Sequence, residues 1–245
     1  MESSRRLGIC FALLLVGSSV SVTGCGSEEA ETEPAMAPPV TQPGFDPFCG
    51  TRPKYEFCED FDTQALPGAF DEHIVERGEM VITDEDAASL PQSLRVTVES
   101  GGTGILRHQF EAGGKLRLFG MLYVSALGEG DVEIGAFSVG DYRVAFGVGA
   151  DGQLWAYDSG SRFAGEGTLP VGKWASFRWD VNLYEDGTGT AKLRFGNDFI
   201  VNTDLLTPPA GAVPVPMATV GLSEATGRWS MRFDNLTVDV GDVTN

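Results

Sequence analysis

The stretch from Leu169 to Thr203 constrains the fold most, because it predicts two β-hairpins that follow one another directly. Apolar and polar residues alternate along residues 175–181, which is the period-two pattern of a strand with one buried face. Two turns follow, at Glu185-Asp186-Gly187 and at Gly196-Asn197-Asp198, and both contain residues that tolerate positive φ. We therefore expect this chain to build antiparallel sheets.

The order of these elements resembles the LamG-like members of the concanavalin A-like lectin/glucanase superfamily. Residues 57–62, Phe-Cys-Glu-Asp-Phe-Asp, look like the first strand of that superfamily. Residues 232–236, Arg-Phe-Asp-Asn-Leu, resemble the last strand of family-16 glycoside hydrolases and their non-catalytic relatives. The resemblance implies an all-β fold, a concanavalin A-like jelly-roll β-sandwich of two antiparallel sheets, over residues 48–245.

Short alternating runs punctuated by glycine predict the strands in the middle of the chain. Four of them, at 116–127, 132–139, 142–149 and 153–157, are separated by Gly/Asp turns and predict one antiparallel meander. Alternation assigns their faces, with the core side carrying Val132, Ile134, Ala136, Tyr142, Val144, Phe146 and Val148. Near the C-terminus the alternation changes phase at Asp234-Asn235, which predicts a β-bulge.

The face opposite this core carries the candidate ligand-binding residues. Glu133 and Arg143 lie there beside small residues, which indicates a shallow groove, and a groove is the usual ligand surface of the superfamily. Trp155 and Tyr157 share one face of the next strand, where two aromatic rings and the two charges would form a sugar subsite. The alternative is that Trp155 and Tyr157 are core residues and that their neighbours face outward.

Glu129, Asp131 and Glu133 form an E-x-D-x-E spacing that is similar to the catalytic signature of family-16 glycoside hydrolases. On a strand the three carboxylates would share one face and could act as nucleophile, orienting group and acid/base. The alternative is structural, because Gly128-Glu129-Gly130-Asp131 is also a strong turn signal.

The resemblance also implies a structural calcium ion, Ca2+, with Asp60 and Asp234 as the candidate metal ligands. Carboxylate oxygens are suitable ligands for calcium. The alternative is that the two carboxylates accept hydrogen bonds at the ends of the sheets.

The N-terminus predicts export and a lipid anchor. Residues 1–24 combine a short basic start with an apolar run, as in a signal peptide, and are too short for a membrane span. Val22-Thr23-Gly24-Cys25 resembles a bacterial lipobox, which implies that Cys25 carries the lipid. Residues 25–47 are acidic and proline-rich with little to bury, and predict a disordered tether. We expect an extracytoplasmic lipoprotein of the bacterial cell envelope, on the outer membrane.

Two cysteines remain after the leader and Cys25 are set aside. Cys49 and Cys58 would lie in an oxidising compartment and close a short loop, which predicts a disulfide. Zinc is the alternative, although two cysteines without nearby histidines do not complete a tetrahedral site.

The chain is strongly acidic, with 35 Asp and Glu against 17 Lys and Arg. This composition argues against nucleic acid and anionic lipid surfaces as partners, because both require a basic face. The sequence favours a non-enzymatic module that binds a polysaccharide or other glycan. A glycoside hydrolase and a protein-binding adhesion or scaffold domain are the alternatives.

Overall fold

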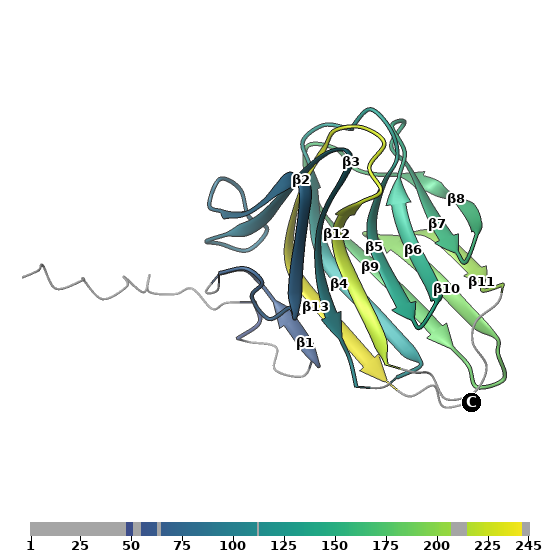
Figure 1. Ribbon diagram of the computed structural model, residues 1–245. Coiled ribbons are helices and arrows are strands. Elements are labelled where there is room, and N and C mark those ends of the chain that lie inside the picture. The colour runs from purple at the N-terminus through teal and green to yellow at the C-terminus, as the bar shows by residue number, and fades with distance from the viewer. Residues whose placement is uncertain (1–47, 51–54, 63–64, 112, 207–214, 242–245) are drawn as a thin grey trace, which may run out of the picture. The chain divides into compact units, whose positions relative to one another are not determined.

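The computed structural model describes residues 48–50, 55–62, 65–111, 113–206 and 215–241 (Figure 1). Within these ranges the regular structure consists of strands. None of these residues belongs to a helix long and apolar enough to cross a membrane. The predicted signal peptide, Cys25 and the tether lie outside the described residues.

The described residues form thirteen strands, and all their pairings are antiparallel. They are β1 (Phe57–Glu59), β2 (Glu72–Thr83), β3 (Ser93–Gln109), β4 (Lys115–Val124), β5 (Val132–Val139), β6 (Tyr142–Val148), β7 (Gln153–Asp158), β8 (Ser161–Thr168), β9 (Trp174–Leu183), β10 (Gly189–Phe195), β11 (Asp198–Asp204), β12 (Pro216–Ser223) and β13 (Trp229–Gly241). Their hydrogen-bonded order is β11-β10-β9-β4-β13-β3-β12-β5-β6-β7-β8, with β1 beside β13 and β2 beside β3.

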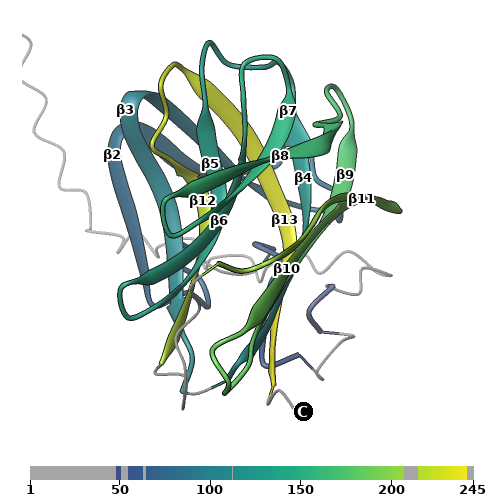
Figure 2. The same cartoon turned by 90° about the vertical axis from the view of Figure 1, so that its right-hand side faces the viewer.

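The long strand β3 connects the two layers of the sandwich. Its first part, Leu94–Val98, pairs with β13, and its last part, Gly104–Gln109, pairs with β12. One layer is therefore β11-β10-β9-β4-β13 and the other is β12-β5-β6-β7-β8, as the side view in Figure 2 shows. The predicted all-β sandwich of two antiparallel layers is confirmed.

The core lies between these layers and is built from the faces that alternation predicts. Phe146 on β6 contacts Trp179 and Phe177 on β9, with ring centroids 5.5 Å and 5.6 Å apart. The two hairpins expected in the C-terminal half are β9-β10 and β10-β11. Burial of these large aromatic side chains is the main favourable contribution to folding.

The predicted meander is partly wrong. Strands β5 to β8 do form a meander, but β4 lies in the other layer between β9 and β13, and β12 takes its place beside β5. Strand β8, which follows the turn at Ser159-Gly160, was not predicted from the sequence. That dipeptide is a turn signal and could have identified the strand.

Two of the register shifts in the sheet test the strand faces predicted from alternation. The shift between Asp234 and Thr237 confirms the predicted bulge in β13. A second shift, between Glu133 and Gly135 on β5, was not predicted. It exchanges the core face and the outer face for the residues of β5 that follow it. As a result Phe137 joins the core, while Ala136 pairs with Ala145 on the opposite face, so the core assignment of Ala136 is wrong.

Cys49 and Cys58 form the predicted disulfide, with Cα atoms 5.7 Å apart. The bond ties residues 48–50 to β1, which itself pairs with β13. Zinc coordination by these two sulfurs is therefore excluded.

Candidate functional site

The outer face of the β12-β5-β6-β7 layer carries a groove of about 710 Å³. Four residues predicted as ligand contacts line it together: Glu133, Arg143, Trp155 and Tyr157. They meet because of the strand register, in which Glu133 and Trp155 both pair with Gly147, and Tyr157 pairs with Ala145. Paired residues of antiparallel strands project to the same face of a sheet.

Trp155 is the largest aromatic side chain that lines the groove, and it is only 9% exposed. Its neighbours Leu154 and Ala156 belong to the core cluster, so the alternative in which Trp155 and Tyr157 face the core is excluded. The Trp155 ring lies over Gly147, where any side chain would collide with it. Glycine at position 147 therefore makes room for the ring.

Glu133 and Arg143 form an ion pair on the floor of the groove. The Glu133 carboxylate also accepts a hydrogen bond from the Ser223 hydroxyl at 2.9 Å. Burial raises the pKa of Glu133, and the bonds from Arg143 and Ser223 act against that rise. About a third of the Arg143 side chain is exposed, so its remaining N–H groups are available to an anion in the groove.

Tyr157 lies on β7, next to Arg143 on β6. The pairing of Tyr157 with Ala145 places its side chain diagonally across from Arg143. The phenol is half-buried and its hydroxyl has no hydrogen-bond partner among the described residues. A hydroxyl in this state can exchange a proton with a bound ligand.

Arg107 contributes a second cation, which was not predicted from the sequence. It lies on β3 opposite Thr219 and lines the same groove. One of its terminal nitrogens, Nη1, bonds Glu72 at 2.9 Å, whereas its Nε is buried without a partner in the described part of the chain. No local pattern marks Arg107, because it reaches the groove only through the pairing of β3 with β12.

The E-x-D-x-E triplet does not form a catalytic site. Glu129 and Asp131 precede β5, in the segment that the alternative interpretation assigns to a turn, and only Glu133 lies on the strand. Glu129 is exposed, and Asp131 forms an ion pair with Arg162 of β8. The hydrolase assignment of Glu129, Asp131 and Glu133 is wrong, because the three carboxylates do not share a strand face.

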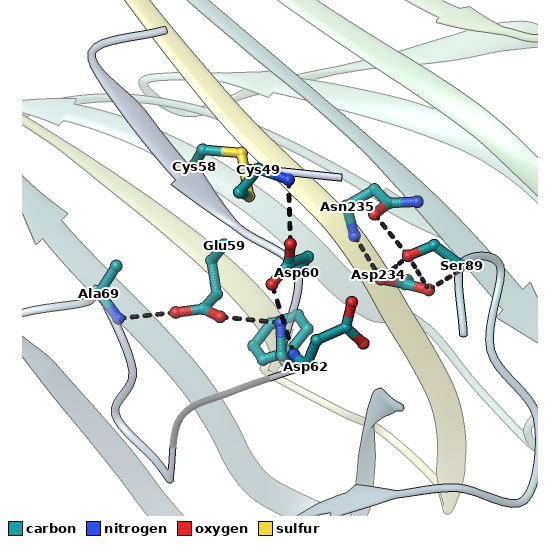
Figure 3. The surroundings of a disulfide bond; sticks show 10 residues. Cys49, Cys58, Glu59, Asp60, Asp62, Ala69, Ser89, Asp234 and Asn235 are labelled. Carbon is teal, nitrogen blue, oxygen red and sulfur yellow. Dashed lines mark hydrogen bonds between the residues drawn. A yellow bond between two sulfur atoms is a disulfide. The ribbon is translucent and has the colours of Figure 1, made fainter. Parts of the chain in front are cut away.

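Asp60 and Asp234 lie close to the disulfide (Figure 3). The Asp60 carboxylate accepts the Cys49 N–H at 2.9 Å. Asp234 accepts N–H groups from Ala88 and Ser89, each at 2.8 Å, and from Asn235 at 2.7 Å. Both oxygens of Asp234 therefore accept backbone hydrogen bonds, as the alternative interpretation of this carboxylate expects.

No three His, Cys, Asp or Glu side chains among the described residues gather in a way that could hold a metal ion. Calcium binding stays a prediction, and no step below depends on it.

The carboxylates near the disulfide make stability depend on pH. Burial raises the pKa of Asp234 from 3.8 to about 7, against the three N–H bonds that lower it, and burial raises the pKa of Asp62 from 3.8 to about 6. A carboxyl with a raised pKa in the folded state binds its proton more tightly when folded. The protonated carboxyl therefore contributes fully to the free energy of unfolding below the pKa of the unfolded state. This contribution is lost as pH rises through the pKa of the folded state.

We expect the thermal midpoint to fall as pH rises from about 4 to about 7. Over this range the titration of Asp234 should lower the free energy of unfolding by a few kcal/mol at most. Differential scanning calorimetry across this range checks the prediction. The Asp62→Asn variant should show a smaller fall, because one of the two groups no longer titrates. A midpoint that rises steadily over the same range would contradict it.

Known proteins resemble this chain in fold rather than in sequence. No family model matches the sequence, and neither does any curated protein. Solved structures do match: an endo-β-1,4-glucuronan lyase from the fungus Trichoderma reesei has a TM-score of 0.57 over 76% of this chain and 96% of its own, at 14% identity. The chain therefore has a jelly-roll β-sandwich fold, as these structures do.

Two further structures agree with this assignment. The cellulose induced protein Cip1 has a TM-score of 0.59 over 78% of this chain and 100% of its own, at 14% identity. A marine PL-14 alginate lyase from Aplysia kurodai has a TM-score of 0.56 over 76% of this chain and 99% of its own, at 10% identity.

These neighbours correct the function predicted from the sequence. They include polysaccharide lyases, which contradicts both the prediction of a non-catalytic carbohydrate-binding module and the expectation that the chain is not an enzyme. The hydrolase alternative already fails on the geometry of Glu129 and Asp131. At this identity the likeness shows the fold, and the chemistry of this chain depends on the residues of its own groove.

Proposed function

We propose that this protein is a polysaccharide lyase that cleaves a polymer of uronic acids by β-elimination in the groove. The observation that carries the proposal is the placement of Arg143 and Tyr157 side by side on β6 and β7, with Trp155 next to them. Support comes from the glucuronan and alginate lyases among the fold neighbours, since both of those polymers consist of uronic acids.

The proposed reaction divides into recognition and proton transfer. Arg143 binds the carboxylate of the sugar at the cleavage point, and its charge stabilises the enolate-like anion that forms when the C5 proton leaves. Tyr157, in its phenolate form, takes the C5 proton; the phenol formed in this way gives that proton to the O4 oxygen as the C4–O4 bond breaks, which regenerates the phenolate. The products are a new reducing end on the fragment that keeps O4 and a C4=C5 double bond on the other fragment.

The electrostatics of the groove favour an anionic sugar in spite of the acidic composition. Glu133 is already paired with Arg143, and Arg107 adds a second cation whose Nε lacks a partner in the described part of the chain. Asp141 and Glu224 also line the groove, but both are exposed, so that solvent screens their charge. Trp155 contributes apolar surface to the wall of the groove, and its ring is covered by the Arg162 guanidinium.

The test is an assay for the double bond. Purified protein is incubated with glucuronan and alginate, and with a neutral β-glucan as the control, while ultraviolet absorbance reports the double bond conjugated to the carboxylate. We expect absorbance to rise with an acidic polymer and to stay constant with the neutral one. Reducing ends that appear without absorbance would indicate hydrolysis, and either that result or no cleavage of any polyuronate would overturn the proposal.

A further inference from the structure

A second hollow adjoins the groove on the side of β8. It has a volume of about 350 Å³ and is lined by Asp131, Asp151, Gln153 and Arg162, among others. Trp155 lines both this hollow and the groove, so the two spaces adjoin at this residue. A polymer in the groove would have to pass Trp155 to reach the second hollow.

Arg162 lies over the Trp155 ring, at the residue where the two spaces adjoin. Its guanidinium carbon lies 4.7 Å from the centre of the Trp155 ring, which is the geometry of a cation–π contact. The same guanidinium pairs with Asp131. Trp155 is more than nine-tenths buried, yet its Nε1 has no hydrogen-bond partner within the described part of the chain.

Asp131 is held in place by its backbone rather than by Arg162. Its N–H donates to the Thr226 hydroxyl at 2.6 Å, and its carbonyl accepts the Thr226 N–H at 2.8 Å. The carboxylate is therefore presented at a fixed point from the loop before β5. The side chains of Arg162 and Asp131 are 49% and 40% exposed, and an ion pair with this exposure contributes little to stability.

We propose that the second hollow is a distal subsite for an acidic sugar and that Arg162 recognises the carboxylate of that sugar. This inference rests on the function proposed above. In the free protein the Arg162 guanidinium pairs with the Asp131 carboxylate. In the complex the sugar carboxylate takes the place of the Asp131 carboxylate, since both have the same charge and the same geometry. The exchange costs little because the Arg162–Asp131 pair is weak and solvent-exposed.

The experiment compares two matched variants. Asp131→Asn removes the competitor for Arg162, and Asp151→Asn removes a carboxylate from the same hollow that has no bond to Arg162. Both are made in a Tyr157→Phe background to slow cleavage. Calorimetry then measures Kd for disaccharides and hexasaccharides of glucuronate and of alginate.

We expect Asp131→Asn to lower the Kd of an acidic hexasaccharide about two- to fivefold and Asp151→Asn to change it less. Disaccharides, which do not reach past Trp155 when bound in the groove, should be affected less than hexasaccharides. Arg162→Ala should weaken hexasaccharide binding and abolish the gain from Asp131→Asn, since the two side chains act as one unit.

Three results would overturn the distal subsite: equal gains from Asp131→Asn and Asp151→Asn, a gain from Asp131→Asn that persists in Arg162→Ala, or no binding of either hexasaccharide. The failure of the proposed function is a separate result. Binding that follows the expected pattern, together with no unsaturated product from the wild-type protein, would reject the lyase and retain the subsite.

Discussion

Replacing Tyr157 by phenylalanine is expected to lower the rate of polyuronate cleavage by about 10²- to 10⁴-fold, the usual contribution of a positioned acid or base. The change removes only the hydroxyl, and that hydroxyl has no hydrogen-bond partner among the described residues, so folding should be unaffected. The loss should fall on kcat rather than on KM, because the hydroxyl acts on the proton and not on the carboxylate. Initial rates of double-bond formation, with the thermal midpoint measured alongside, check this.

The matched control is Tyr184→Phe, which removes a phenol hydroxyl just after β9, away from the groove. This variant should retain the wild-type rate. Full activity in Tyr157→Phe would show that Tyr157 is not the proton-transfer group, and would leave the lyase proposal without its base.

Replacing Trp179 by alanine is expected to lower the free energy of unfolding by about 3–5 kcal/mol, the largest stability effect of any substitution considered for this chain. Trp179 is fully buried on β9, between Leu118 of β4 and Leu193 of β10, and its ring contacts Phe146 of the opposite layer. Truncation would open a cavity between the two layers. Equilibrium unfolding in urea measures the loss.

Trp174→Ala provides the comparison on the same strand. Trp174 is only half-buried, donates a hydrogen bond to Asp86 at 3.1 Å and contacts Tyr123. Its loss should cost clearly less than the loss of Trp179, because less apolar area returns to water. Equal losses at the two positions would contradict the burial described for β9.

Alternation alone identified most of the strands, because a strand that packs one face on a core must alternate along its length. It placed β5 at its observed bounds, and it placed β9, β10 and β11 as two successive hairpins. It also located the bulge in β13 at Asp234, where the phase of the pattern changes. The disulfide followed from the number of cysteines left after the leader and Cys25 were set aside.

Other assignments needed information that no local pattern carries. The bulge between Glu133 and Gly135 moved Ala136 to the groove face, and Ala136 is apolar and buried on either face. The position of β4 depended on which strands are neighbours in space, and neighbouring runs along a chain need not be neighbours in a sheet. The prediction of a catalytic site at Glu129, Asp131 and Glu133 was wrong for a related reason, since a turn and a strand can have the same spacing of carboxylates.

The sequence by itself therefore determined that Trp155 and Tyr157 share one face of a strand, because residues two apart always do. Only the tertiary structure decided which face that is. Both faces of β7 are apolar, so composition could not distinguish them, and the register that pairs Trp155 with Gly147 and Tyr157 with Ala145 settled the question. The groove, its arginines and its aromatic surface exist because long-range pairing brings β3, β12, β5, β6 and β7 into one layer.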